Sequence, residues 1–152
     1  MSRDFADFLE ALNKSGARYV VIGGMAVLSL IPYRTTRDID VLIEPTPDNA
    51  RRVRDAVREW SGAEPAFAAE EFISGDVLSF GGLLRVDVHS MVPGADWATV
   101  WSRRVAGRFA SVPTHFASAP DLIAMKEAAG RPGKDLPDVR RLKKLLEKRR
   151  ET

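Results

Sequence analysis

The chain has 152 residues, 45% hydrophobic and 29% charged with a formal net charge of +2, a balance typical of a globular protein with a sizeable core. It contains no cysteine and only two histidines, which excludes disulfides and thiolate metal sites and argues against a zinc site. Any bound metal would therefore be held by oxygen atoms, which favours magnesium or manganese.

The first part of the chain predicts two helices and two strands in alternation. Residues 4–15 carry apolar side chains at helical spacing and end before Gly16, which indicates an amphipathic helix. Residues 18–22 form an apolar, β-branched run typical of a buried strand, and 24–31 predict a short apolar helix. A second strand is expected over residues 38–43.

The middle of the chain predicts a long helix followed by a hairpin. The helix begins at Pro47, directly after a capping hydroxyl. Residues 62–72 fit either a loop or a fragment of strand. Strands are expected over 76–80 and 83–89, and Gly81-Gly82 between them indicates a two-residue hairpin turn.

The last part of the chain is mainly helical. Residues 95–104 predict a helix, and a last strand within 109–116 is expected at a sheet edge because Pro113 interrupts it. The segment Ser118-Ala119-Pro120-Asp121 resembles a capping box and indicates the start of a helix through Ala129, and a final helix is expected over about 136–149.

These elements predict an α/β fold, with a mixed sheet flanked by helices, because the hairpin adds an antiparallel pair to strands separated by helices. No linker or repeat divides the chain, so we expect one domain over residues 1–152, with about 118–150 as a helical C-terminal extension.

The sequence gives no sign of a membrane segment or a leader. The charged N-terminus lacks the apolar core of a signal peptide. The longest apolar stretch, residues 19–33, is interrupted by two glycines and a proline and is too short to span a bilayer. We therefore expect a cytoplasmic protein.

Three aspartates mark the candidate site. In a strand over 38–43, Asp38 and Asp40 leave the same face, and Asp87 alternates with valines in the same way. Two carboxylates about 5 Å apart at an effective dielectric of roughly 20 repel each other by about 3 kcal/mol. A cation between them, most simply a divalent metal, would remove that cost.

The glycine pair, the Asp-x-Asp and the later lone Asp together resemble the nucleotidyltransferase superfamily of the DNA polymerase β type. The resemblance is strongest to its small bacterial branch of antibiotic nucleotidyltransferases and abortive-infection toxins. It implies that Gly23 and Gly24 hold the triphosphate of an NTP. It also implies that Asp38, Asp40 and Asp87 are catalytic and bind two Mg²⁺ (or Mn²⁺) ions.

Each of these signals has a simpler structural explanation. Asp38 could cap a turn, Asp87 could lie on a solvated strand, and the glycine pair could form an ordinary strand-to-helix turn. Arg37 could neutralise phosphate or restrain a neighbouring aspartate. His89 could help to bind metal or substrate, or could simply be hydrogen-bonded.

A second candidate region spans residues 121–135, which resembles a helix and loop placed over the nucleotide in the same bacterial branch. Lys126, and to a lesser degree Lys134, could contact phosphate, although a lysine on a buried helix can also extend its head group to solvent. Asp135 and Asp138 are expected to cap the last helix or to pair with nearby cations.

The last helix carries a cationic face that is either solvated or attracts a polyanion. Its basic residues are Arg140, Arg141, Lys143, Lys144, Lys148, Arg149 and Arg150.

The predicted function is magnesium-dependent transfer of a nucleoside monophosphate from an NTP to a hydroxyl on RNA, protein or a small molecule, as in a toxin-like enzyme with an antitoxin partner. The alternative is a non-catalytic nucleotide- or partner-binding module, antitoxin-like, on the same fold.

Overall fold

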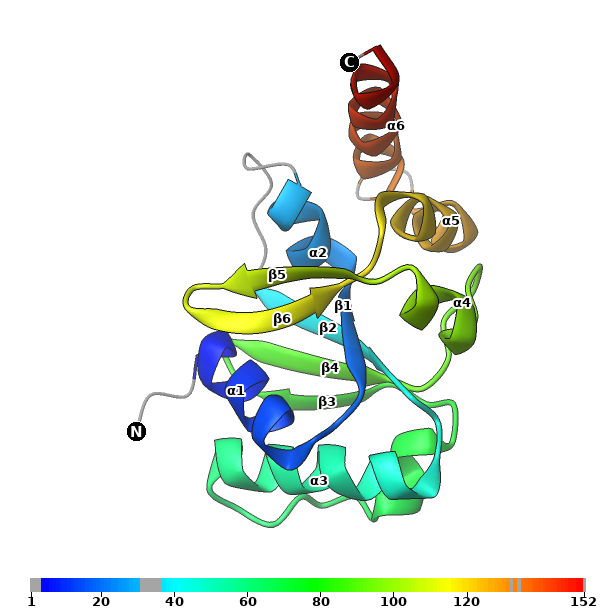
Figure 1. Cartoon of the computed structure of the whole chain (residues 1–152). Helices are drawn as coiled ribbons and strands as arrows, with labels where there is room; N and C mark the ends of the chain where they lie inside the picture. The colour runs from blue at the N-terminus through cyan, green and yellow to red at the C-terminus, as the bar shows by residue number, and fades with distance from the viewer. Residues whose placement is uncertain (1–3, 31–36, 132, 134, 152) are drawn as a thin grey trace.

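The computed structural model describes residues 4–30, 37–131, 133 and 135–151 (Figure 1). Within these residues the helices are α1 (Phe5–Ser15), α2 (Gly23–Leu30), α3 (Pro47–Ser61), the 3-10 helix η1 (Ala69–Ile73), α4 (Trp97–Ser102), α5 (Ala119–Ala129) and α6 (Asp135–Glu151). The strands are β1 (Tyr19–Ile22), β2 (Asp38–Ile43), β3 (Leu78–Gly81), β4 (Arg85–His89), β5 (Val105–Phe109) and β6 (Val112–Phe116). No helix in the described part of the chain is long and apolar enough to cross a membrane.

The described strands form one mixed six-stranded sheet in the order β3-β4-β2-β1-β6-β5. The central strand β2 runs antiparallel to β1 and parallel to β4. The antiparallel pairs β3–β4 and β5–β6 form the two sides of the sheet. The predicted α/β fold with a mixed sheet is therefore confirmed.

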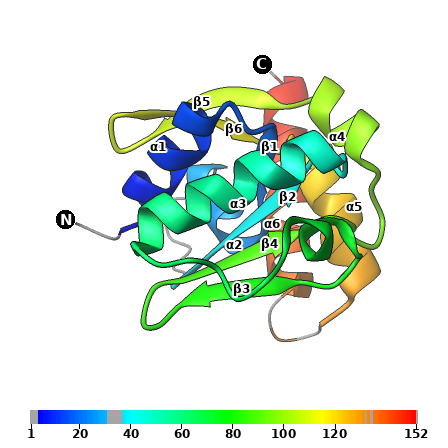
Figure 2. The same ribbon diagram turned by 90° about the horizontal axis from the view of Figure 1, so that it is seen from below.

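Helices cover both faces of this sheet. Helices α1 and α3 lie together on one face, and α2 and α5 lie on the other (Figures 1 and 2). The last helix, α6, packs against α5 and extends away from the sheet (Figure 1). The core lies on both sides of β1 and β2, because the side chains of β1 and those of Ile39, Val41 and Leu42 are almost completely buried.

The capping residues act as the sequence predicts. Thr46 accepts a hydrogen bond from the backbone N–H of Asn49, with Pro47 as the first residue of α3. Ser118 accepts one from the N–H of Asp121 at the start of α5. Such caps satisfy N–H groups that have no partner inside the helix.

In the middle of the chain, one open alternative is decided and one prediction is corrected. The segment 62–72, expected as a loop or a fragment of strand, contains no strand and runs as a loop into η1, whose Phe72 is buried and stacks on Phe80. The hairpin turn has three residues rather than two, because Gly81, at φ 95°, still pairs with Arg85. The left-handed backbone of Gly81 extends the ladder by one residue beyond the expected turn.

The C-terminal part of the sheet also differs from expectation. The segment 109–116 is half of a hairpin, since β5 precedes β6 and forms the edge in its place. Pro113 is tolerated in β6 because β1 pairs with that strand only at Phe116. On the side of Pro113, α1 lies against β6, and Asn13 donates from Nδ2 to the Pro113 carbonyl oxygen at 2.7 Å.

Candidate active site

The three aspartates lie on one face of the sheet. In the parallel pair β2–β4, Asp40 is opposite Asp87 and Asp38 is opposite Arg85. Side chains at paired positions of neighbouring strands leave the same face, and positions two apart along a strand share that face. The alternation in the sequence therefore gave the correct orientation of all three carboxylates.

The glycine bend at the end of β1 lies directly beside Asp40. Ile22 is opposite Asp40 in the β1–β2 pair, and α2 begins at the next residue, Gly23. Gly23 has φ +68°, and a Cβ atom there would lie 2.6 Å from Oδ2 of Asp40. A glycine is required here both by the backbone conformation and by the carboxylate. Gly24 follows, buried in the first turn of α2.

Each carboxylate has protein partners. Nη2 of Arg85 lies 3.0 Å from Oδ2 of Asp38, and its Nε lies 3.2 Å from Oδ1 of Asp87. Ser79, opposite Asp87 in the β3–β4 pair, donates to the same Oδ1 at 2.6 Å. His89 donates from Nε2 to Oδ1 of Asp40 at 2.8 Å. Arg85 thus pairs with two of these acids, and side chains of Ser79 and His89 donate hydrogen bonds to them.

The donor set suits a divalent cation in kind. Asp38, Asp40 and Asp87 offer oxygen ligands on one face and on adjacent register positions, as Mg²⁺ or Mn²⁺ prefers. In the described residues, however, no three acidic or histidine side chains converge on one point in the manner of a metal site. The three aspartates therefore fit such an ion by their chemistry and their positions. To bind it, their side chains would rotate toward one point and Arg85 would move away from Asp38 and Asp87.

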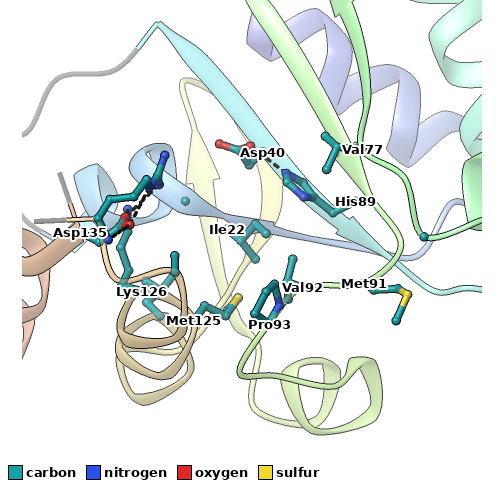
Figure 3. Close-up of a pocket in the computed structure, with 15 residues that line it drawn as sticks. Ile22, Asp40, Val77, His89, Met91, Val92, Pro93, Met125, Lys126 and Asp135 are labelled. Atoms are coloured by element: carbon teal, nitrogen blue, oxygen red, sulfur yellow. Dashed lines mark hydrogen bonds and ion pairs between the residues drawn. The ribbon is translucent and has the colours of Figure 1, made fainter.

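A cavity of about 380 Å³ opens next to Asp40. Asp40 and His89 lie on its strand side, and Lys126 and Asp135 lie on the opposite, helical side (Figure 3). Apolar side chains line the space between these polar groups: Ile22, Val77, Met91, Val92, Pro93, Leu122 and Met125. The volume and the mixture of an apolar lining with a few polar groups are typical of a small-molecule site.

The helical side of the cavity contains a buried ion cluster. Nζ of Lys126, a residue only 5% exposed, lies 3.4 Å from Oδ1 of Asp135 and 3.1 Å from Oδ2 of Asp138. Arg131 donates to both oxygens of Asp135, from Nε at 2.6 Å and from Nη2 at 2.9 Å. Asp138 also has Arg141 at 3.6 Å.

The pKa values of this cluster follow from its contacts. Burial alone would raise the pKa of Asp135, but hydrogen bonds from Arg131 and the charges of Lys126 and Arg131 outweigh it and lower the pKa to about 2. The hydrogen bond to Asp135 raises the pKa of Arg131, with smaller contributions from the charges of Asp40 and Asp138. The charge of Asp40, on the strand side, thus acts on Arg131 on the helical side.

The structure decides several of the alternatives left open by the sequence. His89 is hydrogen-bonded, and Asp135 and Asp138 pair with nearby cations, as expected. Lys126 lines the cavity but is engaged by two aspartates rather than extended to solvent. Arg37 is exposed next to the site. Its backbone carbonyl oxygen accepts a hydrogen bond from the backbone N–H of Arg85, with an N–O distance of 3.4 Å.

Other sequence predictions remain untested. Lys134 lies outside the described residues. The roles in phosphate binding assigned to Arg37 and Lys126, and the metal-binding roles of the three aspartates, stay predictions.

Sequence reasoning missed three residues of the site. Arg85 contacts Asp87 from two residues earlier on β4, Ser79 contacts it from the opposite position on β3, and Arg131 donates two hydrogen bonds to Asp135. The available signal was the short loop between the two predicted helices, which keeps Arg131 within four residues of Asp135. Nothing local to Arg85 or Ser79 distinguishes them from ordinary strand residues.

Comparison with known proteins adds a family to this geometry. The family model described as "Nucleotidyl transferase AbiEii toxin, Type IV TA system" matches residues 7–147. Among curated proteins, none matches the sequence. The matched span includes the glycine bend, all three aspartates and the Lys126 cluster. The chain therefore belongs to the AbiEii family of nucleotidyl transferase toxins from type IV toxin–antitoxin systems.

Proposed function

We propose that this chain transfers a nucleoside monophosphate from an NTP to a hydroxyl acceptor and uses Mg²⁺ or Mn²⁺. The observation that carries the proposal is the position of Asp40 between the Gly23 bend and Asp87. This arrangement brings a helix N-terminus, which favours anions, within reach of carboxylates that favour cations. A nucleotide with a divalent cation is a ligand that matches both.

In this proposal the triphosphate lies at the N-terminus of α2, with Lys126 and Arg131 facing it from the other side of the cavity. The glycine backbone allows close approach of the phosphates, and the positive charges of Lys126 and Arg131 offset the phosphate charge. A cation held by Asp38, Asp40 and Asp87 would lower the pKa of the acceptor hydroxyl and offset charge on the leaving group.

The reaction would proceed by direct displacement at the α-phosphorus. The acceptor oxygen forms a bond to that phosphorus, and the bond from phosphorus to the oxygen bridging the α- and β-phosphates breaks. Pyrophosphate leaves with that electron pair. The acceptor proton passes to the carboxylate of Asp87, which acts as the general base.

The acceptor is RNA, protein or a small hydroxylated molecule. The basic face of α6 supports a macromolecular acceptor, because clustered lysine and arginine side chains attract polyanions. Because the family is described as a toxin of a type IV toxin–antitoxin system, we expect a cytoplasmic antitoxin partner to control the activity.

The test is incubation of the purified chain with each of the four NTPs, labelled at the α-phosphate, with and without Mg²⁺. We expect cation-dependent release of pyrophosphate or self-labelling. Asp40→Asn and Asp87→Asn should reduce either signal on the order of 100-fold or more, as loss of a central charged group does elsewhere.

The matched control is Asp55→Asn, an exposed aspartate on α3 that pairs with Arg58. It should retain the activity of the wild type. Activity that persists in Asp40→Asn and Asp87→Asn would contradict the proposal.

The alternative is a nucleotide- or partner-binding module without catalysis. It is supported by the existing contacts of the carboxylates, since Arg85 pairs with Asp38 and Asp87 and His89 is hydrogen-bonded to Asp40. In that case NTP binding measured by calorimetry would be unchanged in Asp38→Asn and Asp87→Asn, and no pyrophosphate would be released.

A further inference from the structure

We propose that Arg85 competes with the divalent cation for Asp38 and Asp87 and thereby sets the cation concentration at which the site fills. The inference rests on the proposed function, because it assumes that these carboxylates bind a metal. It assigns Arg85 a regulatory role that the carboxylate pattern alone does not suggest.

The register of the sheet places Arg85 to bridge two of the three carboxylates. Arg85 is opposite Asp38 in the β2–β4 pair and two residues before Asp87 on β4, so all three side chains leave one face. One edge of the guanidinium contacts both acids, with Nη2 on Asp38 at 3.0 Å and Nε on Asp87 at 3.2 Å. The positive charge therefore lies between the oxygens that would ligate a metal.

The exposure of Arg85 and Asp87 indicates which of the two side chains can leave. The side chain of Arg85 is 50% exposed, whereas that of Asp87 is only 9% exposed and is also held by Ser79. Arg85 can swing into water and keep its charge hydrated, whereas the carboxylate of Asp87 cannot leave without losing its buried contacts. Entry of a cation would thus displace the arginine and leave the acids in place.

The competition has a measurable consequence. A cation that enters the wild-type site must break two charge-assisted contacts of Arg85, and a site without the arginine is free of that cost. We expect Arg85→Met, which keeps a long aliphatic side chain, to bind Mn²⁺ about tenfold more tightly, equivalent to about 1.4 kcal/mol.

The experiment is a titration of the purified chain with Mn²⁺, followed by the electron paramagnetic resonance signal of the free ion, with no nucleotide present. Four proteins are compared with the wild type: Arg85→Met, Arg85→Lys, Asp87→Asn and the control Arg51→Met. Arg51 is an exposed arginine on α3, on the opposite face of the sheet. Arg85→Lys keeps the charge but cannot contact two carboxylates with one planar edge, so its affinity should lie between those of the wild type and Arg85→Met.

The outcomes separate this inference from the proposed function. Tighter binding in Arg85→Met, with Arg51→Met unchanged and Asp87→Asn weakened, supports the competition. Equal or weaker binding in Arg85→Met, while Asp87→Asn still loses affinity, overturns the role of Arg85 and leaves the metal site intact. Absence of Mn²⁺ binding in every variant overturns the metal-dependent function and the competition together. If Arg85→Met does not fold, the Mn²⁺ affinities of the wild type and Arg85→Lys are compared. Tighter binding in Arg85→Lys supports the competition, and equal or weaker binding overturns it.

Discussion

Oδ2 of Asp40 occupies the space that a side chain on Gly23 would need, since a Cβ atom there would lie 2.6 Å away. The backbone of Gly23 is also left-handed, at φ +68°. Gly23 and the carboxylate of Asp40 therefore pack against each other, and a side chain at position 23 would displace that carboxylate.

The first prediction is that Gly23→Ala loses both stability and activity. A left-handed alanine costs about 1–2 kcal/mol, and the clash with Asp40 adds to it. For a chain of this size, that corresponds to a fall in Tm of roughly 2–8 °C, measurable by thermal denaturation followed by circular dichroism. NTP turnover should fall further than stability explains, because Asp40 must move.

Gly82→Ala is the control for this prediction. A Cβ atom on Gly82 would meet no heavy atom within 4 Å, and the residue lies in the β3–β4 turn. It should leave both Tm and turnover close to those of the wild type. A Gly23→Ala variant as active as Gly82→Ala would show that the close approach to Asp40 is not needed.

The second prediction concerns stability in acid. The pKa of Asp135 is about 2 in the folded chain against an ordinary 3.8, so its ionised form stabilises the fold. That contribution, about 2 kcal/mol, is complete above pH 4 and is lost as the pH falls toward 2. Urea unfolding at several pH values should show this slope in the wild type and lack it in Asp135→Asn.

At neutral pH, Asp135→Asn should itself lower the free energy of unfolding by about 3 kcal/mol, because it removes a buried partner of Lys126 and Arg131. The exposed Asp55→Asn should change it by less than about 0.5 kcal/mol. A wild-type slope that survives unchanged in Asp135→Asn would assign the acid sensitivity to other carboxylates.

The third prediction separates the structural role of Lys126 from a role in nucleotide binding. Lys126→Met leaves two buried carboxylates with one fewer cation and should cost about 3–5 kcal/mol of stability. Adding Asp138→Asn removes one of those charges, while Asp135 keeps Arg131. The double variant should therefore recover much of the stability, as measured by urea unfolding.

NTP affinity of the same double variant then tests the contact with phosphate. If Lys126 binds the triphosphate, affinity stays at least about tenfold weaker than in Asp138→Asn alone, even though the fold has recovered. Affinity that returns together with stability would restrict Lys126 to holding α5 against α6.

The fourth prediction concerns His115, which is distant from the candidate site in the sequence. Burial first, and then the positive charge of Arg104, lower the pKa of His115 below 6.5. The neutral ring is the form that stabilises the fold, so this stability is present above pH 6.5 and is lost as the pH falls through the lowered pKa. NMR titration of the ring protons should give this value directly.

Arg104→Ala should raise the pKa of His115 without restoring it fully, because burial remains. The guanidinium of Arg104 also lies 3.7 Å from the centre of the Trp101 ring, so the variant removes a cation–π contact as well. Arg51→Ala, on α3, is the control and should leave the titration unchanged. An unchanged pKa in Arg104→Ala would leave burial as the sole cause.

Patterns within single segments predicted much of the fold and the orientation of the acids. Alternation of apolar and polar residues correctly predicted β2 and β4 and the shared face of Asp38 and Asp40. The starts of α3 and α5 were also predicted from local sequence, by Thr46 followed by Pro47 and by Ser118. Within the helix predicted over 95–104, Trp97 and Trp101 pack against the core and stack on each other at helical spacing.

The sequence could not predict what depends on register between distant segments. Strand β5 has mostly exposed residues and no apolar alternation, so it has no pattern of its own and depends on β6. Arg85 becomes important only because β4 pairs with β2 at Asp38, 47 positions earlier. The prediction of a two-residue turn was wrong for a similar reason. The pairing of Gly81 with Arg85 on the other strand decides where the turn begins.

The two sides of the cavity come from segments far apart in the sequence, which fixes the order in which the site is built during translation. The glycine bend and Asp40 leave the ribosome early, Asp87 follows much later, and Lys126 and Arg131 emerge later still. A nascent chain stalled within α4 would carry every acid of the sheet but lack the helical side of the cavity. In a family of toxins, nucleotide binding as proposed here would thus be delayed until α5 and α6 have cleared the exit tunnel.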